Sequence, residues 1–235
     1  MTAARAPRSL RRLPLPKAKT SRKRVPVRRN QGERSEKSRT QILEVALRLF
    51  SHQGYRGTSM REIAEAAGVS TGNVYHHFPE KELIFDTLLE EYWKDIQDPD
   101  LPLNRTLESG AFPDNIEALG NAVRDFVASH RASIALIYVD VVEFEGSHVR
   151  KFYAQIASRF EAFLAKQAET RGIRSQLRPE VSTLSAVMMA TRFYLNFFTV
   201  EILFGVPNHF GKAADQVVRE TADILRYGIL RDPRR

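Results

Sequence analysis

The sequence predicts an all-α protein in which a small N-terminal helical unit precedes a larger one. From residue 38 onward, apolar residues recur at helical spacing, and no stretch alternates in the manner of a half-buried strand. Glycines and prolines separate the helical stretches. The 235 residues suffice for one or two domains, and 43% apolar with 27% charged residues is typical of a globular protein.

The first two helices have clear sequence signals at their ends. Apolar residues three or four apart give the first helix one face, and Gly54 ends it: Ile42, Ala46, Leu49 and Phe50. Ser59 and Glu62 form an S-x-x-E capping box at the start of the second helix. Gly68 is expected to end this helix after barely two turns.

The next helices follow the same logic. Ser70 is the expected cap of a short third helix that runs through Phe78. Pro79 suits the first position of a fourth helix, whose apolar face is Phe85, Leu89, Tyr92 and Ile96. Residues 98–114, rich in Pro, Asp and Gly, are expected to be a loop. Further helices are expected near 115–130, 132–145, 147–171, 180–204 and 211–230.

The third helix, Ser70–Phe78, is the informative element of the N-terminal unit. Val74 and Phe78 are expected to face inward, which leaves a polar and nearly uncharged outer side: Thr71, Gly72, Asn73, Tyr75, His76 and His77. Such groups bond to base edges and phosphate oxygens. Gly72 costs about 1 kcal/mol relative to alanine in a helix, so its presence suggests close approach to another surface. Lys81 opposes the dipole of the next helix, which favours a phosphate partner.

The run from Arg39 to Leu89 resembles the DNA-binding domain of the TetR family of bacterial repressors. The matching motifs are I-L-x-x-A-x-x-L-F at 42–50, G-Y-x-x-T-S-M-x-x-I-A at 54–64 and A-G-V-S-x-G-x-V-Y-x-H-F at 67–78, followed by Lys81. Glu80 departs from the pattern, because the family often has a small capping residue there. The resemblance implies about nine helices, with a helix-turn-helix head joined to an α-helical regulatory and dimerisation domain.

The resemblance also implies roles by position. Thr71, Gly72 and Asn73 would meet bases, whereas phosphates would be held by Tyr75, His76, Lys81 and, at the start of the first helix, Thr40. The caps Ser59 and Ser70 complete the expected DNA-binding set, although Ser59 is primarily a cap. Tyr75 packing on the first helix is an open alternative, and His77 is expected to be structural. The expected boundaries are a disordered basic arm at 1–36, the head at 37–84 and the regulatory domain at 85–235.

The positive charge is concentrated at the N-terminus. Residues 1–39 hold 14 Lys/Arg and two acids, so they carry +12, whereas the rest of the chain carries −4. Four prolines and few apolar residues indicate an arm without a core of its own. We expect this arm to track DNA phosphates or enter a minor groove. A solubilising tail and an organelle transit peptide are the alternatives.

The C-terminal helices have two apolar faces each, which predicts burial on two sides. In the helix near 180–204 one stripe runs from Leu184 to Ile202 and a second contains Phe193, Phe197 and Phe204. One face would pack on the protein's own core and the other on a second subunit, giving a homodimer on a palindromic operator. The alternative is a fully buried monomer core.

Aromatic and polar residues of the middle helices suggest a pocket for a small apolar or aromatic, acyl-like effector. The proposed lining residues are Trp93, Phe126, Tyr138, Phe144, Phe152, Tyr153, Phe193, Tyr194 and Phe197, and the polar anchors are Asp140, Glu143, Arg192 and Asn196. Ordinary core packing is the alternative for each aromatic residue. Asp140 and Arg192 are also considered as a buried pair.

Other classes of function have weak support. The histidines are scattered, and no H-E-x-x-H, G-x-S-x-G or G-x-G-x-x-G motif occurs, so neither catalysis nor a metal or cofactor is expected. Zero cysteine excludes disulfides and thiolate sites. No secretory h-region or membrane span is expected, which favours a cytoplasmic protein. An architectural DNA-coating protein without an effector remains a rival to a repressor released by its ligand.

Overall fold

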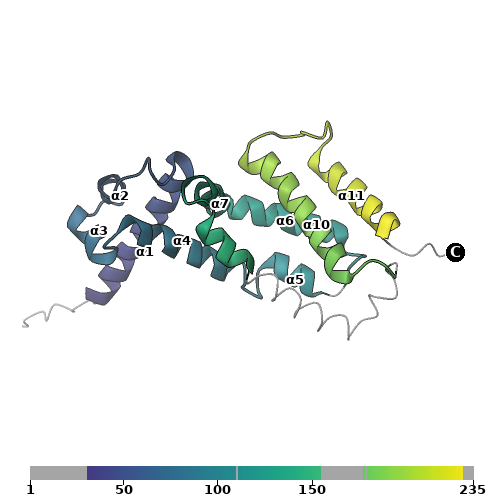
Figure 1. Ribbon diagram of the computed structural model, residues 1–235, viewed down its shortest axis with the longest axis horizontal. Coiled ribbons are helices and arrows are strands. Elements are labelled where there is room, and N and C mark those ends of the chain that lie inside the picture. Colours follow the sequence, from purple (N-terminus) through teal and green to yellow (C-terminus); the bar gives the residue numbers. More distant parts are fainter. Residues whose placement is uncertain (1–30, 110, 155–176, 178, 230–235) are drawn as a thin grey trace, which may run out of the picture.

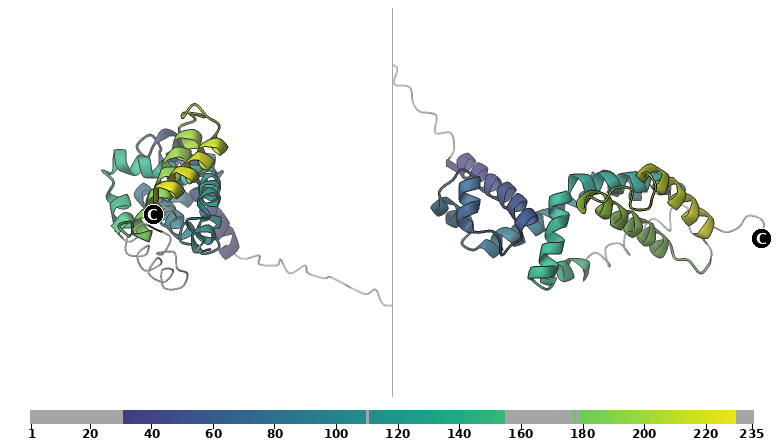
Figure 2. Two further views of the ribbon diagram at one scale, coloured as in Figure 1. Left: turned by 90° about the vertical axis from the view of Figure 1, so that its right-hand side faces the viewer. Right: turned by 90° about the horizontal axis from the view of Figure 1, so that it is seen from above.

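The computed structural model describes residues 31–109, 111–154, 177 and 179–229. These residues form helices and no β-strand, which confirms the all-α prediction. Figure 1 shows an elongated molecule with α1–α3 at one end and α10 and α11 at the other. The view from above in Figure 2 separates a small head from a larger body. Residues 1–30 of the arm and 155–171 of an expected helix lie outside the described residues.

The head consists of α1 (Gln31–Gln53), α2 (Met60–Ala66), α3 (Thr71–His77) and the first half of α4 (Lys81–Asp95). Its core contains the predicted apolar faces of these helices, and the residues exposed by 2% or less are Ile42, Ala46, Phe50, Ile63, Ala64, Val74, Phe78, Ile84, Phe85 and Leu89. These buried residues come from all four segments of the head. The head is therefore stabilised by packing among its helices rather than by any one helix.

Helix α1 begins earlier than the sequence suggested. It starts at Gln31, so residues 31–36, which the composition assigned to the arm, are helical. The last proline of the arm is Pro26, so nothing after it interrupts a helix. Glu33 in the first turn also complements the helix dipole.

The head and the body share helix α4, so the boundary expected after residue 84 falls inside a continuous helix. Phe85, Leu88 and Leu89 belong to the core of the head, whereas Tyr92 belongs to the core of the body. Leu136 of α7 (Arg131–Glu143) is fully buried in the core of the head. The body thus completes the head's core, which ties the two units together.

The body contains α5 (Pro102–Glu108), α6 (Ile116–Ser129), α7, a helix described over 147–154, α10 (Thr183–Phe198) and α11 (Ala214–Ile229). Helix α10 continues into a π-helical turn, Thr199–Leu203. The expectation of a loop throughout 98–114 was wrong, because Pro102 starts α5. The side-chain amide of Asn104 donates to the carbonyls of Ile96, at 3.0 Å, and Asp98, at 2.7 Å, and so holds α5 against the end of α4.

The core of the body requires one close approach between helices. An added Cβ at Gly120 of α6 would lie 2.9 Å from Cζ of Tyr194 and 2.9 Å from Cγ1 of Val218. The Tyr194 hydroxyl donates to the Val218 carbonyl at 3.0 Å, and burial raises the pKa of this phenol. Glycine at this position lets α6, α10 and α11 pack together around the tyrosine ring. The sequence suggested that Tyr194 lines a pocket. The structure places this residue in the core of the body instead.

Residues Thr183–Leu203 are long and apolar enough by composition to cross a membrane. A core helix of a globular protein passes the same test. In this fold Ala186, Ala190 and Phe198 of the segment are buried in the main apolar cluster of the body. The packing therefore accounts for the apolar character of α10.

Candidate nucleic-acid interface and ligand pocket

The turn between α2 and α3 forms as its sequence predicts. The Ser59 side chain accepts from the Glu62 amide, and the Glu62 carboxylate accepts from the Ser59 amide, which confirms the capping box. Gly68 has a φ of +66°, a left-handed conformation that favours glycine. Ser70 caps α3 by accepting from the Asn73 amide at 3.1 Å. Two short helices are thereby held at a sharp, fixed turn.

Helix α3 has a buried side and an exposed side. Val74 is fully buried and the C-cap Phe78 is 2% exposed, as predicted. Thr71, Gly72, Tyr75 and His76 are exposed, and Tyr75 retains 51% of its surface. The head therefore presents a short helix whose outer side carries hydroxyl, imidazole and phenol groups. This arrangement disfavours the alternative in which Tyr75 packs on the first helix.

Gly72 and Asn73 have features that the head itself does not explain. A Cβ at Gly72 would meet nothing nearer than the Ser70 hydroxyl at 3.9 Å, so the fold does not demand glycine there. The Oδ1 atom of half-buried Asn73 has no hydrogen-bond partner among the described residues. An unpaired buried acceptor is costly. Both features fit a surface that another molecule approaches.

Thr40, Ser59 and Ser70 of the predicted set, and the neighbouring His77, make contacts within the head. The exposed Thr40 hydroxyl donates to the Glu36 carbonyl within α1 at 3.1 Å. Ser59 and Ser70 are caps, as described above. His77 is half-buried, and burial is the main reason that its pKa is lowered. Its position beside Phe78 agrees with the expected structural role.

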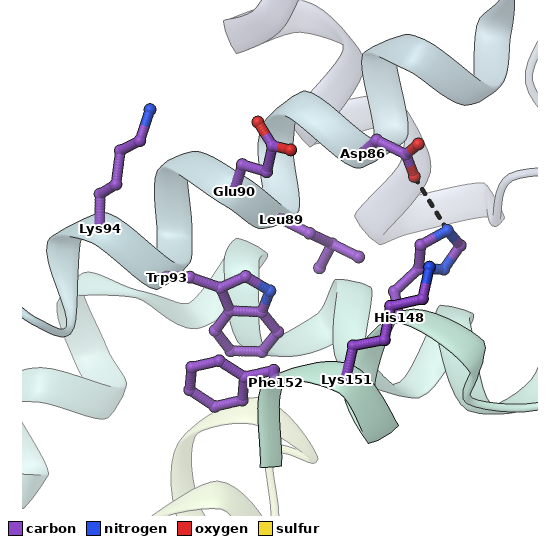
Figure 3. Close-up of a pocket in the computed structure, with 8 residues that line it drawn as sticks. All are labelled: Asp86, Leu89, Glu90, Trp93, Lys94, His148, Lys151 and Phe152. Carbon is purple, nitrogen blue, oxygen red and sulfur yellow. Dashed lines mark ion pairs between the residues drawn. The ribbon is translucent and has the colours of Figure 1, made fainter. Parts of the chain in front are cut away.

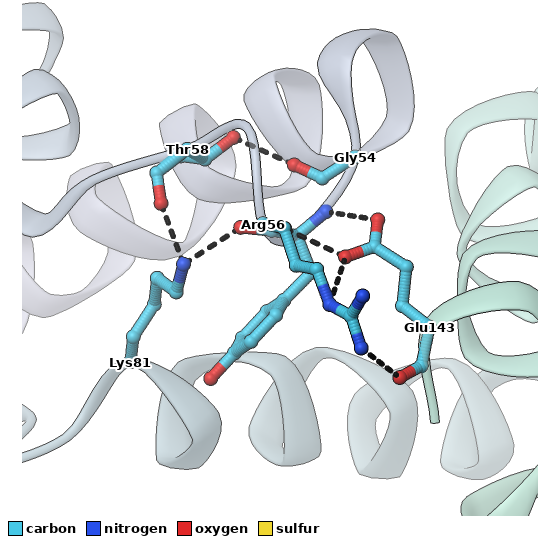
Figure 4. A network of polar contacts seen from close by, with 6 residues as sticks. Gly54, Arg56, Thr58, Lys81 and Glu143 are labelled. Carbon is cyan, nitrogen blue, oxygen red and sulfur yellow. Dashed lines mark hydrogen bonds and ion pairs between the residues drawn. The ribbon is translucent and has the colours of Figure 1, made fainter. Parts of the chain in front are cut away.

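Lys81 is placed differently from the prediction. Its ammonium donates to the carbonyls of Tyr55 and Thr58, both at 2.7 Å, and lies 4.0 Å from the centre of the Tyr55 ring (Figure 4). Burial lowers the pKa of this ammonium. Contacts inside the head thus account for a positive charge at this position without a phosphate partner. Pro79 also lies outside α4, which begins at Lys81 after the N-cap Glu80.

Glu143, at the end of α7, connects the body to the turn that follows α1. Its carboxylate accepts from the backbone amides of Tyr55, at 2.9 Å, and Arg56, at 2.7 Å, as Figure 4 shows. An added Cβ at Gly54 would lie 2.5 Å from Glu143 Oε1, so a larger residue would crowd this contact. Gly54 also has a φ of +80°, a conformation that favours glycine. We call residues 54–58 with Glu143 the junction. Glu143 was expected as a pocket anchor, but it holds this turn instead.

His148, in the helix at 147–154, makes a further connection to α4 and α7. Its Nε2 atom lies 2.9 Å from Asp86 of α4, the ion pair drawn in Figure 3, and its Nδ1 atom lies 2.5 Å from fully buried Asp140 of α7. Asp140 also accepts from the Val149 amide at 3.0 Å. The considered Asp140–Arg192 pair is therefore wrong, because the partners of Asp140 are on the adjacent helix.

A cavity of about 440 Å³ lies in the body among α4, α5, α6, α7, α10 and residues 152 and 153. Seven of the proposed residues line it: Trp93, Phe126, Tyr138, Phe152, Tyr153, Arg192 and Asn196. Five further lining residues were not predicted from the sequence: Tyr92, Ile137, Met188, Thr191 and Leu195. Such a volume is within the usual range of small-molecule sites. We call this space the body cavity.

Three other proposed lining residues lie elsewhere. Phe144 stacks on Phe85, with ring centres 4.9 Å apart, and packs on the core of the head. Phe193 and Phe197 contact the ring of Phe210, at 6.2 and 5.2 Å between centres. Helical periodicity placed these aromatics on apolar faces but could not tell which neighbour each face meets.

The walls of the body cavity are shared with a smaller surface hollow of about 370 Å³. Trp93 and Phe152 stack with an interplanar angle of 9° and line both spaces. In Figure 3 this pair lies beside the His148–Asp86 contact, which faces the same hollow. The aromatic wall of the cavity is thus adjacent to a polar link with α4.

The α10–α11 pair leaves a broad apolar surface exposed. The exposed fractions are 60% for Met189, 52% for Phe210, 70% for Ile224 and 78% for Tyr227. A groove of about 360 Å³ runs between Met189, Phe193, Val217 and Ile224. Contiguous exposed apolar surface marks an interaction site. We call these residues the α10–α11 face.

The fold and the exposed α3 define a helix-turn-helix protein with a helical second domain. Residues 42–88 match the family model described as "Bacterial regulatory proteins, tetR family". The chain thus resembles this family over its head. As the matches below show, it is similar to proteins named as transcriptional repressors.

Two curated relatives and one solved structure illustrate the likeness. The repressor KstR2 of Rhodococcus jostii is 43% identical over 58 residues, 25% of this chain and 28% of that protein. KstR2 of Mycobacterium tuberculosis is 29% identical over 152 residues, 61% of this chain and 70% of that protein. The structure of AibR in complex with isovaleryl coenzyme A and operator DNA is 18% identical, covers 80% of this chain and 97% of that chain, and has a TM-score of 0.53.

The first of these matches spans 28% of the relative's own length. The structural likeness shows the fold alone. The likeness to the family model therefore lies in the head.

Proposed function

We propose that the protein is a homodimeric, sequence-specific DNA-binding repressor of the cytoplasm, which a small apolar effector releases from a palindromic operator. The observation that carries the proposal is the exposed polar side of α3 on a head of the TetR family. A recognition helix of this kind enters the major groove and reads base edges with its N-terminal residues. Thr71, Gly72 and Asn73 stand at that end of α3.

Phosphate contacts would position this helix on the duplex. Tyr75 and His76 are exposed and can donate to phosphate oxygens, as can Thr40 by rotating away from its own helix. Lys81 is no longer proposed for this role, because its ammonium is bonded inside the head. The basic arm would add affinity that is independent of sequence and sensitive to salt.

A second copy of the chain is the proposed partner of the α10–α11 face. The 70% exposure of Ile224 and 78% exposure of Tyr227 on one helix leave apolar area that a partner subunit would cover. A twofold interface uses the same patch on both subunits, and so two helices from each would meet. Two heads would then read the two halves of a palindrome, which compensates for the few bases that one short helix reaches.

The route from effector to DNA would pass through α4 and α7. The aromatic pair Trp93–Phe152 forms one wall of the body cavity and adjoins His148, which contacts Asp86 of α4. Glu143 at the end of α7 holds the turn of the head. A ligand that displaces these helices would change the spacing of the two heads. It shifts the equilibrium only by its differential affinity for the two arrangements.

Selection of bound sites from random DNA by the full chain tests the proposal. We expect an inverted repeat whose half-sites are about one helical turn, ~34–36 Å, apart. Asn73→Ala should relax the preference within each half-site and cost about 1–3 kcal/mol of binding free energy. Asn121→Ala, on an exposed position of α6, is the matched control and should leave the enriched sequence unchanged. Recovery of the same motif at the same affinity by Asn73→Ala would refute the assignment of α3.

A further inference from the structure

The body cavity has an unusual distribution of charge. Among the described residues that line it, Arg192 carries the one formal charge, and none is an aspartate or a glutamate. Most of the other lining side chains are aromatic or aliphatic, including Trp93, Phe126 and Ile137. A cavity of this composition is suited to an apolar molecule and offers no counter-charge for a cation.

Arg192 is not committed to a partner within the described part of the chain. None of the ion pairs there involves its guanidinium, whose carbon lies 5.7 Å from the centre of the Tyr153 ring. The side chain is exposed, and Asn196 lies one helical turn further along α10. The planar fork of an arginine binds a carboxylate through two parallel hydrogen bonds. A ligand carboxylate at the mouth of the cavity would accept both of these hydrogen bonds from Arg192.

Thr191 provides an independent observation on the same wall. Its Oγ1 atom is buried and has no hydrogen-bond partner among the described residues, although the residue lines the cavity. Threonine in a helix commonly donates to the carbonyl four residues earlier, and Thr199 does so with Leu195 at 2.7 Å. An unpaired buried hydroxyl is unfavourable, and an oxygen of a bound ligand would remove this cost. Thr191 and Arg192 are adjacent in sequence at the cavity.

We propose that the body cavity binds an apolar molecule with one carboxylate, whose charged end lies at Arg192 and Thr191 and whose apolar end packs on Trp93 and Phe126. The inference rests on the proposed effector function and adds the chemical class of the effector. Uncharged molecules would lose the arginine contact. Amines would place a cation beside Arg192 with no carboxylate among the described lining residues to offset it.

Calorimetric titration of the full chain with matched probes tests this inference. The probes are decanoate, decanamide and decylamine, with naphthylacetate and naphthylacetamide as an aromatic pair. We expect each carboxylate to bind about tenfold more tightly than its amide, equivalent to about 1.4 kcal/mol, and more tightly than the amine. The preference should weaken at high salt, because Arg192 is exposed.

Variants assign the preference to the residue. Arg192→Gln should equalise the carboxylate and the amide, and Arg192→Lys should retain part of the difference, since it keeps the charge but loses the fork. Arg219→Gln, on an exposed position of α11 outside the cavity, should leave the preference intact. A thermal melt of each variant verifies that it is folded.

The outcomes separate this inference from the proposed function. Equal or tighter binding of the amide or the amine, binding of no probe, or a carboxylate preference that survives Arg192→Gln would overturn the assignment of the anionic group. Arg192-dependent binding of the carboxylates would support it. If those carboxylates then left the affinity for the selected operator unchanged, the inference about the cavity would stand and the proposed release mechanism would fail.

Discussion

The head and the body use their apolar surface in different ways. In the head, the rings of Phe50, Tyr55 and Phe85 pack with centres 5.5–5.8 Å apart, and Phe144 of the body closes this cluster. The body keeps a cavity of about 440 Å³ and exposes large apolar side chains on α10 and α11. The head is thus a closed unit that presents a polar helix, whereas the body has room for a ligand and a partner. The difference supports the proposal that the head reads DNA and the body senses a ligand.

The largest expected effect is at the junction, where the two regions meet. Glu143→Ala removes the acceptor of two backbone amides, and a hydrogen bond to a charged group contributes about 1.5–3 kcal/mol. We expect a loss of about 3 kcal/mol in the free energy of unfolding, measured by urea denaturation. This value is at the low end of the sum for two such bonds, because the two freed amides regain partial solvation. Glu44→Ala, at an exposed position of α1, is the control and should change stability little. Equal stabilities of the two variants would show that the junction is a weak contact.

The next largest loss of stability is expected from a substitution in the core of the body. Gly120→Ala places a methyl group 2.9 Å from both Tyr194 and Val218, and overpacking of this kind costs about 1–3 kcal/mol. The loss should appear as a lowered midpoint of thermal unfolding and as changed tyrosine fluorescence. An unaltered melt would mean that α6 and α10 separate freely, contrary to the close packing described above.

Substitution of Lys81 tests whether its ammonium stabilises the head or contacts a DNA phosphate. Lys81→Met keeps the apolar stem but leaves the Tyr55 and Thr58 carbonyls without this donor, and so it should lower stability by about 1–2 kcal/mol. Lys94→Met, at an exposed position of the same helix, should have little effect. The slope of log affinity for DNA against log salt should be unchanged in folded Lys81→Met protein. A reduced slope would restore the phosphate contact that the sequence suggested.

The smallest effect on stability is expected at Gly72, and it has the opposite sign. Gly72→Ala adds a methyl group that meets nothing within 3.9 Å, so the head should gain up to about 1 kcal/mol from the higher helix propensity of alanine. Affinity for the selected operator should nevertheless fall, because the methyl group would stand between α3 and the bases. A variant that is more stable and binds equally well would show that the backbone of α3 does not approach DNA closely.

The sequence predicts the structure correctly where the determining signals are local. The Ser59–Glu62 capping box, the Ser70 cap and the inward side chains Val74 and Phe78 depend on residues within one or two turns. These signals define the helix-turn-helix and therefore most of the candidate DNA interface.

The sequence was less informative where a side chain finds its partner far along the chain. Lys81 bonds to carbonyls 23 and 26 residues away, and Glu143 bonds to amides 87 and 88 residues away. Phe144 likewise packs on the head rather than lining the body cavity. Helical spacing identifies a face but not the element that covers it. The cavity residues were predicted in part because α4, α6 and α10 each turn an aromatic or polar face toward it.

Hydrogen–deuterium exchange of the full chain, with and without its selected operator, tests the central claim that the head and the body respond to each other. Coupling between two sites is reciprocal, so DNA bound at α3 should alter exchange in α7, the second half of α4 and residues 147–154 as well as in the head. Glu143→Ala should confine the change to the head. Protection restricted to α1–α3 in the wild-type chain would contradict the account.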